Sequence, residues 1–414
     1  MRRVTALTLV LLATVALSAC GSGEDSGSRT LTWFIAKQPG GALDVLADRC
    51  SRQSDGRYRI QLEYLPSQAD QQREQLVRRL GAEDDTIDII GADVVWTGEF
   101  ANAGWLRPVP AARRATLTRG VFDSVRRTAT FENRLYAAPL WSNTQLLWYR
   151  KDRVDRAPRT WDELLDEADR LGDDGVVAIQ GSRYEGLVVL ASALINSAGT
   201  RVLDGPDRLG LRRAPTVRAL EILARLARTH GTADIDTSDE DSASKSFEAG
   251  TATFELNYPF VYPAAKANAP AVYEQMAAAK YPRVDPSRPS NPPLGGFNLG
   301  VSSYAKDPDR AWDAIECLVS SRNQLEVTKR EGLPPVRPDL FDRRTVKDAY
   351  PGFARTIRES IEDAEPRPSE SPAYQDVSLA IQRALHPLTK LDPAKAYDDL
   401  REKVQQAIDR EGLL

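Results

Sequence analysis

Apolar and polar positions along the chain repeat with two periods, one typical of strands and the other typical of helices. Short apolar runs fit buried strands, and segments with helical spacing lie between them. In chain order these strands and helices are expected at 31–35, 42–51, 58–64, 68–80, 87–90 and 98–103. Strands and helices that alternate at this spacing predict an α/β fold with parallel strands covered by helices.

A second region with the same alternation begins near residue 135. Its expected elements are strands at 144–149, 176–179, 253–256 and 299–301, and helices at 160–171, 187–196, 214–228, 242–248 and 394–408. Thr160 and Glu163 have the spacing of a capping box, which predicts where the first of these helices begins. Residues 262–293 are rich in Ala and Pro and are expected to form a loop. Two such regions in a chain of 414 residues predict two domains.

The N-terminus has the pattern of an export signal. Arg2 and Arg3 precede an apolar run at 4–17, which is too short to cross the ~30 Å core of a bilayer as a helix. Leu17-Ser18-Ala19-Cys20 follows and resembles the lipobox of bacterial lipoproteins. This resemblance implies a signal peptide at 1–19, a lipid on Cys20, and anchoring at the outer face of the cytoplasmic membrane. An ordinary secretory signal with an incidental cysteine is the alternative. Residues 20–28 are expected to be a flexible tether.

Composition argues against several classes of function. The chain has 55 Lys+Arg against 59 Asp+Glu and a net charge of -4, which does not favour a nucleic-acid binder. It has 2 His and 3 Cys, too few for the usual zinc, haem or iron–sulfur sites, and no glycine-rich nucleotide-binding motif. His230 and His386 are interpreted as helix-end or surface residues rather than catalytic groups. We therefore expect no metal and no cofactor.

Export changes the interpretation of Cys50 and Cys317, because an oxidising compartment favours a disulfide between them. Each cysteine lies in a predicted helix, so two buried thiols that never meet are the alternative. A disulfide requires the two Cα atoms to lie within ~7 Å of each other.

Several motifs together resemble the extracellular solute-binding family that includes the maltodextrin-binding proteins. They occur in a consistent order over about 30–340. They are Asp152 after Trp148-Tyr149, Arg159-Thr160-Trp161-Asp162-Glu163-Leu164, Phe247-Glu248-x-Gly250 and Gly295-Gly296. Longer strings resemble, more specifically, the trehalose-binding lipoproteins of mycobacterial importers. These strings are Asp93-Val94-Val95-Trp96-Thr97-x-Glu99-Phe100, Leu135-Tyr136-Ala137-Ala138-Pro139, Asn143-Thr144-Gln145-Leu146-Leu147-Trp148-Tyr149, Glu185-Gly186-Leu187-Val188-Val189 and Gly332-Leu333-Pro334.

The resemblance implies two α/β lobes joined by a hinge that the chain crosses three times, with the ligand held between the lobes. The crossings would lie near 136–141, 291–296 and 326–332. Lobe 1 would contain 29–137 and 294–328, and lobe 2 would contain 138–293 and 329–414. Cys50 and Cys317 would then share lobe 1, which supports the disulfide. The resemblance further implies a protein that is not an enzyme and that delivers a disaccharide to the permease subunits of an ABC importer. The sequence gives no sign of oligomerisation, so we expect a monomer.

A sugar needs polar groups for its hydroxyls and flat aromatic faces for its C–H surfaces. The resemblance assigns these roles to Asp93 and Glu240 as acceptors, Asn143 as donor and acceptor, Arg337 as a forked donor, Tyr258 as a stacking platform, and Gln38, Gln72 and Tyr184 as further contacts. Whether Trp33, Trp96 and Trp141 also face the cleft stays open.

These assignments have alternatives. Asp93 could cap the helix that follows it, Glu240 could be only a first-turn helix carboxylate, Arg337 could be a solvated surface residue, and Tyr258 could be a core aromatic. Position 258 is tryptophan in the trehalose binders, so the identity of the disaccharide stays open. Other functions also stay open: a glycoside hydrolase that uses Asp93 with Glu240 or Glu255 as its carboxylate pair, a binder of another oligosaccharide such as a maltodextrin, or a structural lipoprotein without a ligand.

Overall fold

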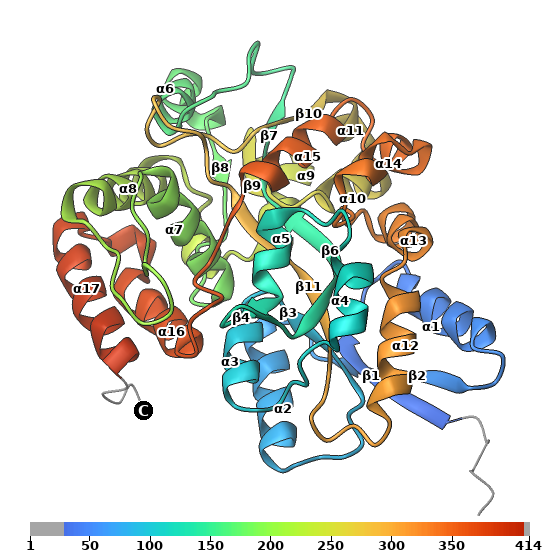
Figure 1. Cartoon of the computed structure of the whole chain (residues 1–414). Coiled ribbons are helices and arrows are strands. Elements are labelled where there is room, and N and C mark those ends of the chain that lie inside the picture. Colours follow the sequence, from blue (N-terminus) through green and yellow to red (C-terminus); the bar gives the residue numbers. More distant parts are fainter. Residues whose placement is uncertain (1–28, 410–414) are drawn as a thin grey trace, which may run out of the picture.

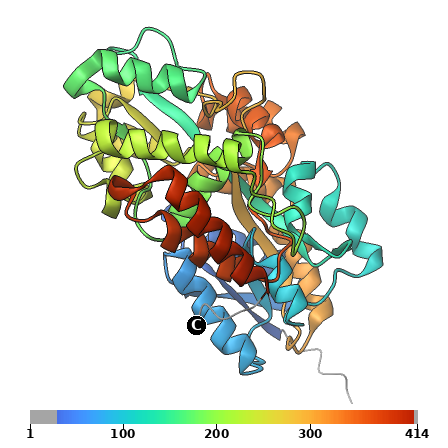
Figure 2. The same ribbon diagram turned by 90° about the vertical axis from the view of Figure 1, so that its left-hand side faces the viewer.

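The computed structural model describes residues 29–409, which form two main β-sheets toward opposite ends of an elongated molecule (Figures 1 and 2). The export signal, Cys20 and the tether lie outside these residues. The strands are β1 (Arg29–Ala36), β2 (Tyr58–Leu65), β3 (Ile89–Asp93), β4 (Thr130–Phe131), β5 (Arg134–Leu135), β6 (Ala137–Thr144), β7 (Leu146–Arg150), β8 (Val177–Ala178), β9 (Phe254–Asn257), β10 (Met276–Ala279), β11 (Pro293–Val301) and β12 (Glu365–Pro366).

The α-helices cover the faces of the two sheets. They are α1 (Ala42–Gln53), α2 (Ala69–Gly81), α3 (Thr97–Asn102), α4 (Ala111–Thr118), α5 (Asp123–Thr128), α6 (Trp161–Leu171), α7 (Glu185–Ser197), α8 (Arg213–Arg225), α9 (Glu240–Glu248), α10 (Val261–Asn268), α11 (Pro270–Gln275), α12 (Pro308–Leu318), α13 (Ser321–Glu331), α14 (Arg344–Ala349), α15 (Ala354–Asp363), α16 (Tyr374–Leu385) and α17 (Pro393–Asp409). Short turns of 3-10 or π-helix lie at η1 (Gly172–Asp174), η2 (Leu226–His230), η3 (Ile235–Thr237), η4 (Pro338–Asp342) and η5 (Leu388–Lys390).

The first sheet has the strand order β12-β11-β3-β1-β2, with β6 paired to β11. Strand β1 pairs in parallel with β2 and β3, as the sequence predicts, whereas β11 runs antiparallel to both β3 and β6. Apolar residues on one face pack against α1 and α12, and those on the other pack against α2 and α3. This arrangement places the carboxyl ends of β1 and β3 beside the middle of the molecule, where ligands of open α/β sheets bind.

The second sheet has the order β10-β7-β9-β8. Alternate residues of β9 face opposite sides, because successive side chains of a strand point in opposite directions. Phe254 and Leu256 join a core with α6, α7, α8, α16 and α17. The helices α9, α10, α14 and α15 pack on the other face around Trp148.

Two expectations about boundaries are corrected. A boundary between residues 137 and 138 falls inside β6, which stays paired with β11 as far as Thr144 and Leu294, so the chain enters the second sheet only at β7. A boundary after residue 328 falls inside α13. This helix stays on lobe 1 to its last residue, because Glu331 accepts hydrogen bonds of 2.7 Å from the backbone N–H groups of Gly40 and Ala42.

The expected loop at 262–293 is wrong over its first half. Residues 261–275 form α10 and α11, and β10 follows at 276–279. Proline does not prevent these helices because Pro270 lies in the first turn of α11, where the missing N–H would have no partner.

Within the described residues, no helix combines the length and apolar character needed to cross a membrane.

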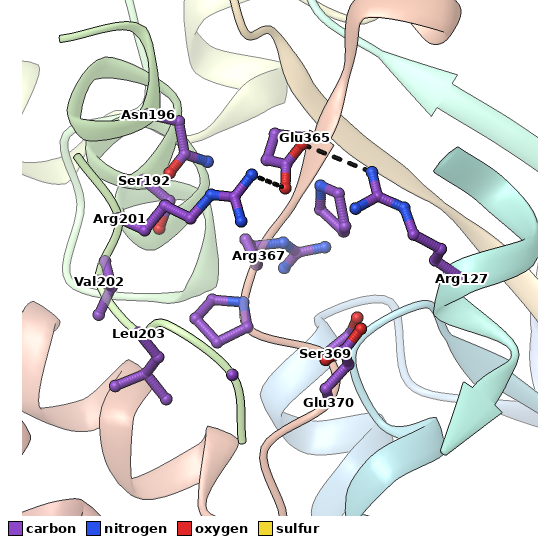
Figure 3. A pocket seen from close by; sticks show the side chains of 13 residues that line it. Arg127, Ser192, Asn196, Arg201, Val202, Leu203, Glu365, Arg367, Ser369 and Glu370 are labelled. Carbon is purple, nitrogen blue, oxygen red and sulfur yellow. Dashed lines mark hydrogen bonds and ion pairs between the residues drawn. The ribbon is translucent and has the colours of Figure 1, made fainter. Parts of the chain in front are cut away.

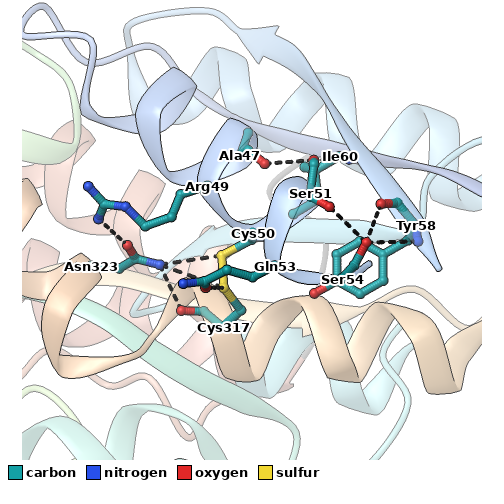
Figure 4. The surroundings of a disulfide bond; sticks show 10 residues. All are labelled: Ala47, Arg49, Cys50, Ser51, Gln53, Ser54, Tyr58, Ile60, Cys317 and Asn323. Atoms are coloured by element: carbon teal, nitrogen blue, oxygen red, sulfur yellow. Dashed lines mark hydrogen bonds between the residues drawn. A yellow bond between two sulfur atoms is a disulfide. The ribbon is translucent and has the colours of Figure 1, made fainter. Parts of the chain in front are cut away.

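Cys50 and Cys317 form a disulfide that ties α1 to α12, with their Cα atoms 5.8 Å apart (Figure 4). Asn323 lies beside the bond, and its amide donates to the Cys317 carbonyl at 2.8 Å while Arg49 donates to its Oδ1 at 2.6 Å. The bond joins the two chain segments that build lobe 1, which are separated by 267 residues.

We expect loss of this bond to destabilise lobe 1, because it closes a long loop in the unfolded chain. The double variant Cys50→Ala/Cys317→Ala should lose about 2–4 kcal/mol of unfolding free energy in urea relative to the oxidised wild type. Reductant should lower the stability of the wild type toward that of the variant and leave the variant unchanged. Equal urea midpoints for oxidised and reduced wild type would contradict a stabilising role.

Candidate functional site

A cavity with about 380 Å³ of free space lies between the two sheets. Both sheets and their helices contribute to it, and every residue that the sequence assigned to the cleft except Arg337 lines it. The lining residues are Gln38, Ser67, Gln68, Ala69, Gln72, Asp93, Trp141, Asn143, Tyr184, Glu185, Gly186, Val189, Asp239, Glu240, Asp241, Tyr258, Gly295, Gly296, Phe297, Leu333 and Arg367.

The floor of the cavity is formed by the paired strands β6 and β11. Asn143 lies opposite Gly295 in the register of these strands. Because Gly295 has no side chain, Asn143 and Tyr258 remain uncovered. A Cβ atom at position 295 would lie 3.5 Å from Cβ of Asn143 and 3.8 Å from Cε1 of Tyr258. Next along the floor, the rings of Trp141 and Phe297 lie 5.0 Å apart between centroids. The floor therefore offers an amide beside an aromatic surface.

Lobe 2 contributes the starts of two helices to the wall. Glu240 is the first residue of α9, and the hydroxyl of Tyr184, which precedes α7, donates a hydrogen bond to its carboxylate. The phenol of Tyr184 can cross the first turn of α7 only because residue 186 is glycine, since a Cβ there would lie 2.1 Å from the hydroxyl oxygen. Glu240 thus combines the two roles considered for it, as a first-turn helix carboxylate and as a cavity residue.

Lobe 1 contributes the end of β3 and the start of α2. Asp93 is the last residue of β3, and its Oδ1 accepts from the backbone N–H of Val95 at 3.1 Å. Gln72 is 3 % exposed, and its Nε2 donates to the Ser67 carbonyl at 2.9 Å. Its Oε1 is buried and has no hydrogen-bond partner among the described residues.

Arg367 joins the two lobes at the inner end of the cavity. Its guanidinium donates to Asp93 of lobe 1 at 3.2 Å and to Glu185 at the start of α7 in lobe 2. Arg367 is 4 % exposed, so its charge is taken out of water and must be compensated within the protein. The carboxylate of Glu185 also accepts from Tyr374 and, at 2.6 Å, from Ser378 of α16.

Burial has the largest effect on the pKa of two carboxyls that line the cavity, those of Asp93 and Glu240. It raises the pKa of Asp93 above its ordinary value; the Arg367 guanidinium opposes this shift, and the Glu185 carboxylate adds to it. Burial also raises the pKa of Glu240, against a lowering by the hydrogen bond from Tyr184. A cavity group that donates hydrogen bonds to these carboxyls would therefore stabilise their charged forms.

The position of Arg367 is fixed from outside the cavity. Its neighbour Glu365 accepts from Arg127 of α5 at 3.4 Å and from Arg201 at 2.9 Å, and Figure 3 shows these two arginines approaching it from opposite sides. Strand β12 also pairs with the start of β11. The residues around Glu365 and Arg367 line a second, smaller pocket (Figure 3).

The expectation that Arg337 reaches the cleft is corrected. Only Leu333 of its segment lines the cavity. The carbonyl of Val336 accepts from the backbone N–H of Phe122 at 3.0 Å, which carries the chain away from the cavity toward α5. The Arg337 guanidinium pairs with Asp339, with its Nε 3.0 Å from Oδ1, beside Gly120.

The structure shows which of the three tryptophans, whose position the sequence left open, lines the cavity. Trp141 lines the cavity, whereas Trp33 and Trp96 lie in the two cores of lobe 1.

Sequence reasoning missed Arg367 and Glu185 as cavity residues. Arg367 is flanked by Pro366 and Pro368, which indicates an extended segment, but no spacing connects it to residues 93 and 185. Within the described residues, no group of His, Cys, Asp and Glu is arranged to hold a metal ion.

We expect Arg367→Met to destabilise the protein by about 3–5 kcal/mol, because it leaves Asp93 and Glu185 buried without their cation. The matched variant Arg337→Met breaks only a partly exposed pair and should change stability by less than about 1 kcal/mol. Urea unfolding at neutral pH measures both. The loss in Arg367→Met should shrink as the pH is lowered, because burial raises the pKa of Asp93 and protonation of this carboxyl removes its unpaired charge. Equal losses in the two variants would contradict this role of Arg367.

The comparisons with known proteins agree on one family. The sequence profile described as "Bacterial extracellular solute-binding protein" matches residues 55–325. A relative from Deinococcus radiodurans, named "Probable ABC transporter-binding protein", is 25 % identical over 345 residues, which cover 79 % of this chain and 81 % of its own.

Solved structures share the fold. Maltose-bound MalE3 of T. maritima has a TM-score of 0.82 at 24 % identity, covering 91 % of this chain and 99 % of its own. A solute-binding protein of Thermotoga lettingae bound with α-D-tagatose has a TM-score of 0.79 at 22 % identity, covering 92 % and 100 %. The GacH receptor of Streptomyces glaucescens has a TM-score of 0.77 at 17 % identity, covering 92 % and 99 %.

These findings confirm the expected two-lobed α/β fold and the expectation that the chain is a binding protein rather than an enzyme. They also support export, because the family is extracellular. Since the profile spans well over half of the chain, the protein belongs to the bacterial extracellular solute-binding protein family.

Proposed function

We propose that the protein is the substrate-binding subunit of a sugar ABC importer and that it binds trehalose or a closely related disaccharide. The cavity between the two lobes supports this proposal most directly. Its free space of about 380 Å³ lies within the range of small-ligand pockets. Polar and aromatic side chains from both lobes face it, so a ligand held there would contact both lobes and favour their closed arrangement.

The chemistry of the cavity fits a neutral polyhydroxylated ligand. Asp93 and Glu240 offer carboxylate acceptors on opposite walls, Asn143 offers an amide on the floor, and Gln72 adds a second amide on the lobe 1 wall. Trp141, Phe297 and Tyr258 provide the flat surfaces that the C–H faces of a sugar require. In this proposal Arg367, rather than Arg337, would be the cationic donor beside the ligand, because its guanidinium lies next to Asp93 and lines the cavity.

The relatives support a sugar as the ligand class. The solved structures with this fold include proteins bound to maltose, to α-D-tagatose and to acarbose. Trehalose is the more specific part of the proposal and rests on the strings at 93–100, 135–139, 143–149, 185–189 and 332–334. A maltodextrin is the second candidate, because the relative with the highest of the three TM-scores given above holds maltose.

The proposal places the protein outside the cytoplasmic membrane. The sequence before Cys20 supports a lipid anchor on that cysteine, and residues 20–28 would connect the anchor to the folded part. The partners we propose are the permease subunits of the importer, to which the closed, monomeric protein would deliver its sugar.

A calorimetric titration with trehalose, maltose, sucrose and glucose tests the function. We expect trehalose to bind with a Kd in the micromolar range, which corresponds to about -8 kcal/mol. Glu240→Gln should weaken binding roughly 10- to 100-fold, because a bond to a charged acceptor contributes about 1.5–3 kcal/mol. Glu248→Gln, at the other end of the same helix, is the matched control and should leave Kd within twofold.

The four titrations also separate the alternatives. Tight binding of maltose with none of trehalose would move the assignment to a maltodextrin binder. An absence of heat with all four sugars, together with an unchanged melting temperature, would refute the proposed function. Release of glucose from trehalose, lost in Asp93→Ala, would instead indicate a hydrolase.

A further inference from the structure

A pair of buried polar residues lies directly behind the lobe 2 wall of the cavity. Glu255 and Asn257 are both 0 % exposed and share one face of β9, opposite the face that carries Phe254 and Leu256. This face of the sheet packs against α9 in an apolar cluster. Two polar side chains in such a cluster need hydrogen-bond partners, because burial of unpaired polar groups is unfavourable.

Asn257 connects this pair to two cavity residues. Its Nδ2 donates to the backbone carbonyl of Glu240 at 2.9 Å and to Oε1 of Glu255 at 2.6 Å. Its Oδ1 accepts from the backbone N–H of Tyr258 at 2.9 Å. Both N–H groups and the oxygen of the amide are therefore in use. One side chain thus holds the start of α9, which carries Glu240, against the end of β9, which leads into Tyr258.

Asn257 is itself held in place by its surroundings. Its backbone carbonyl accepts from Nε1 of Trp148 at 2.9 Å, and β9 lies between β7 and β8 in the middle of the sheet. Glu255 fixes the remaining side-chain freedom of Asn257, because it accepts from one of the two amide hydrogens. Loss of that acceptor would leave a buried N–H without a partner.

The surroundings of Glu255 favour its uncharged form. The neighbouring strands place Trp148 and Ala178 opposite it, and neither residue titrates. On α9, Glu248 opposes its ionisation by charge repulsion, while the Glu240 carboxylate is turned toward Tyr184. On α10, Tyr262 stacks on Trp148, and burial holds the pKa of this tyrosine above its ordinary value. Mainly through burial, the pKa of Glu255 rises to about 8.

We propose that Asn257 is a positioning residue for ligand binding and that Glu255, in its protonated form, is the buried anchor that holds Asn257 in place. The proposal rests on the proposed function and deepens it, because it explains how Glu240 and Tyr258 are presented to the sugar. Deprotonation of Glu255 puts a charge into an apolar cluster where its Oε2 has no hydrogen-bond partner among the described residues. That charge would draw the Asn257 amide more strongly toward Oε1 and water toward Oε2, and both changes would loosen the link to Glu240 and Tyr258.

The inference predicts that sugar affinity falls in alkaline solution through Glu255. In calorimetry with trehalose and maltose, the Kd of the wild type should rise about fivefold or more between about pH 7 and pH 9.5. Glu255→Gln keeps the acceptor for Asn257 and cannot ionise. It should bind within twofold of the wild type at pH 7 and keep that affinity at the alkaline end.

A second variant separates positioning from folding. In Glu255→Gln/Asn257→Asp the new amide can donate to the new carboxylate, so the hydrogen bond between positions 255 and 257 is restored in reverse. The donor to the Glu240 carbonyl is not restored. Because the new carboxyl lies in the same apolar cluster, we expect this double variant to be less stable than the wild type but more stable than Asn257→Asp alone, and to bind sugar at least tenfold more weakly than the wild type.

The outcomes distinguish this inference from the proposed function. If the wild type binds none of the sugars, the proposed function fails. If the wild type binds but the double variant binds equally well, or if Glu255→Gln loses affinity at high pH as the wild type does, the inference is overturned. Melting temperatures supply a readout without ligand. Because the folded state holds a proton on Glu255 that the unfolded state loses at its ordinary pKa, stability should fall as the pH rises toward about 8 in the wild type, and less so in Glu255→Gln.

Discussion

The arrangement of the cavity depends on one buried cation, the guanidinium of Arg367. A buried arginine needs anionic partners, and Asp93 and Glu185 supply them from opposite lobes. The two carboxylates in turn need the cation, since each is removed from solvent. Because the three groups come from distant parts of the chain, they can satisfy one another only when β3, α7 and the segment after β12 meet. The electrostatic requirement thus sets where the two walls of the cavity stand.

The walls and the floor of the cavity are held in place by different interactions. The floor consists of two paired strands, whose backbone hydrogen bonds keep Asn143 and Trp141 in register. The lobe 2 wall consists of helix starts, where a first-turn carboxylate such as Glu240 is stabilised by the helix itself. The helix start and the hydrogen bond from Tyr184 only partly offset the burial of this carboxylate, because the pKa of Glu240 stays above its ordinary value. Its oxygens would therefore gain from hydroxyl donors of a neutral ligand.

Periodicity in the sequence predicts much of the fold, because burial of one face leaves a direct trace in the pattern of side chains. The expected helix at 42–51 and strand at 58–64 agree with α1 and β2 to within a few residues. The helices α10 and α11 were hidden because Ala and Pro carry little periodic signal and Pro270 occupies a first turn. Arg337 and Arg367 could not be told apart in advance. Each follows or adjoins proline, and only the hydrogen bond from Phe122 to Val336, a contact between distant segments, turns Arg337 away.

The difference between local sequence patterns and contacts between distant segments also explains why some cavity residues can be predicted from the sequence and others cannot. Asp93 and Glu240 lie at the ends of regular elements, and such ends collect at the edge of a sheet whatever the rest of the chain does. Burial raises the pKa of both carboxyls, so their charged forms are poorly stabilised by the protein alone. Hydroxyl groups of a bound sugar would supply the missing donors. In the proposed complex the ligand would be part of the electrostatic balance of the cavity, because its hydroxyl groups would donate hydrogen bonds to these two carboxyls.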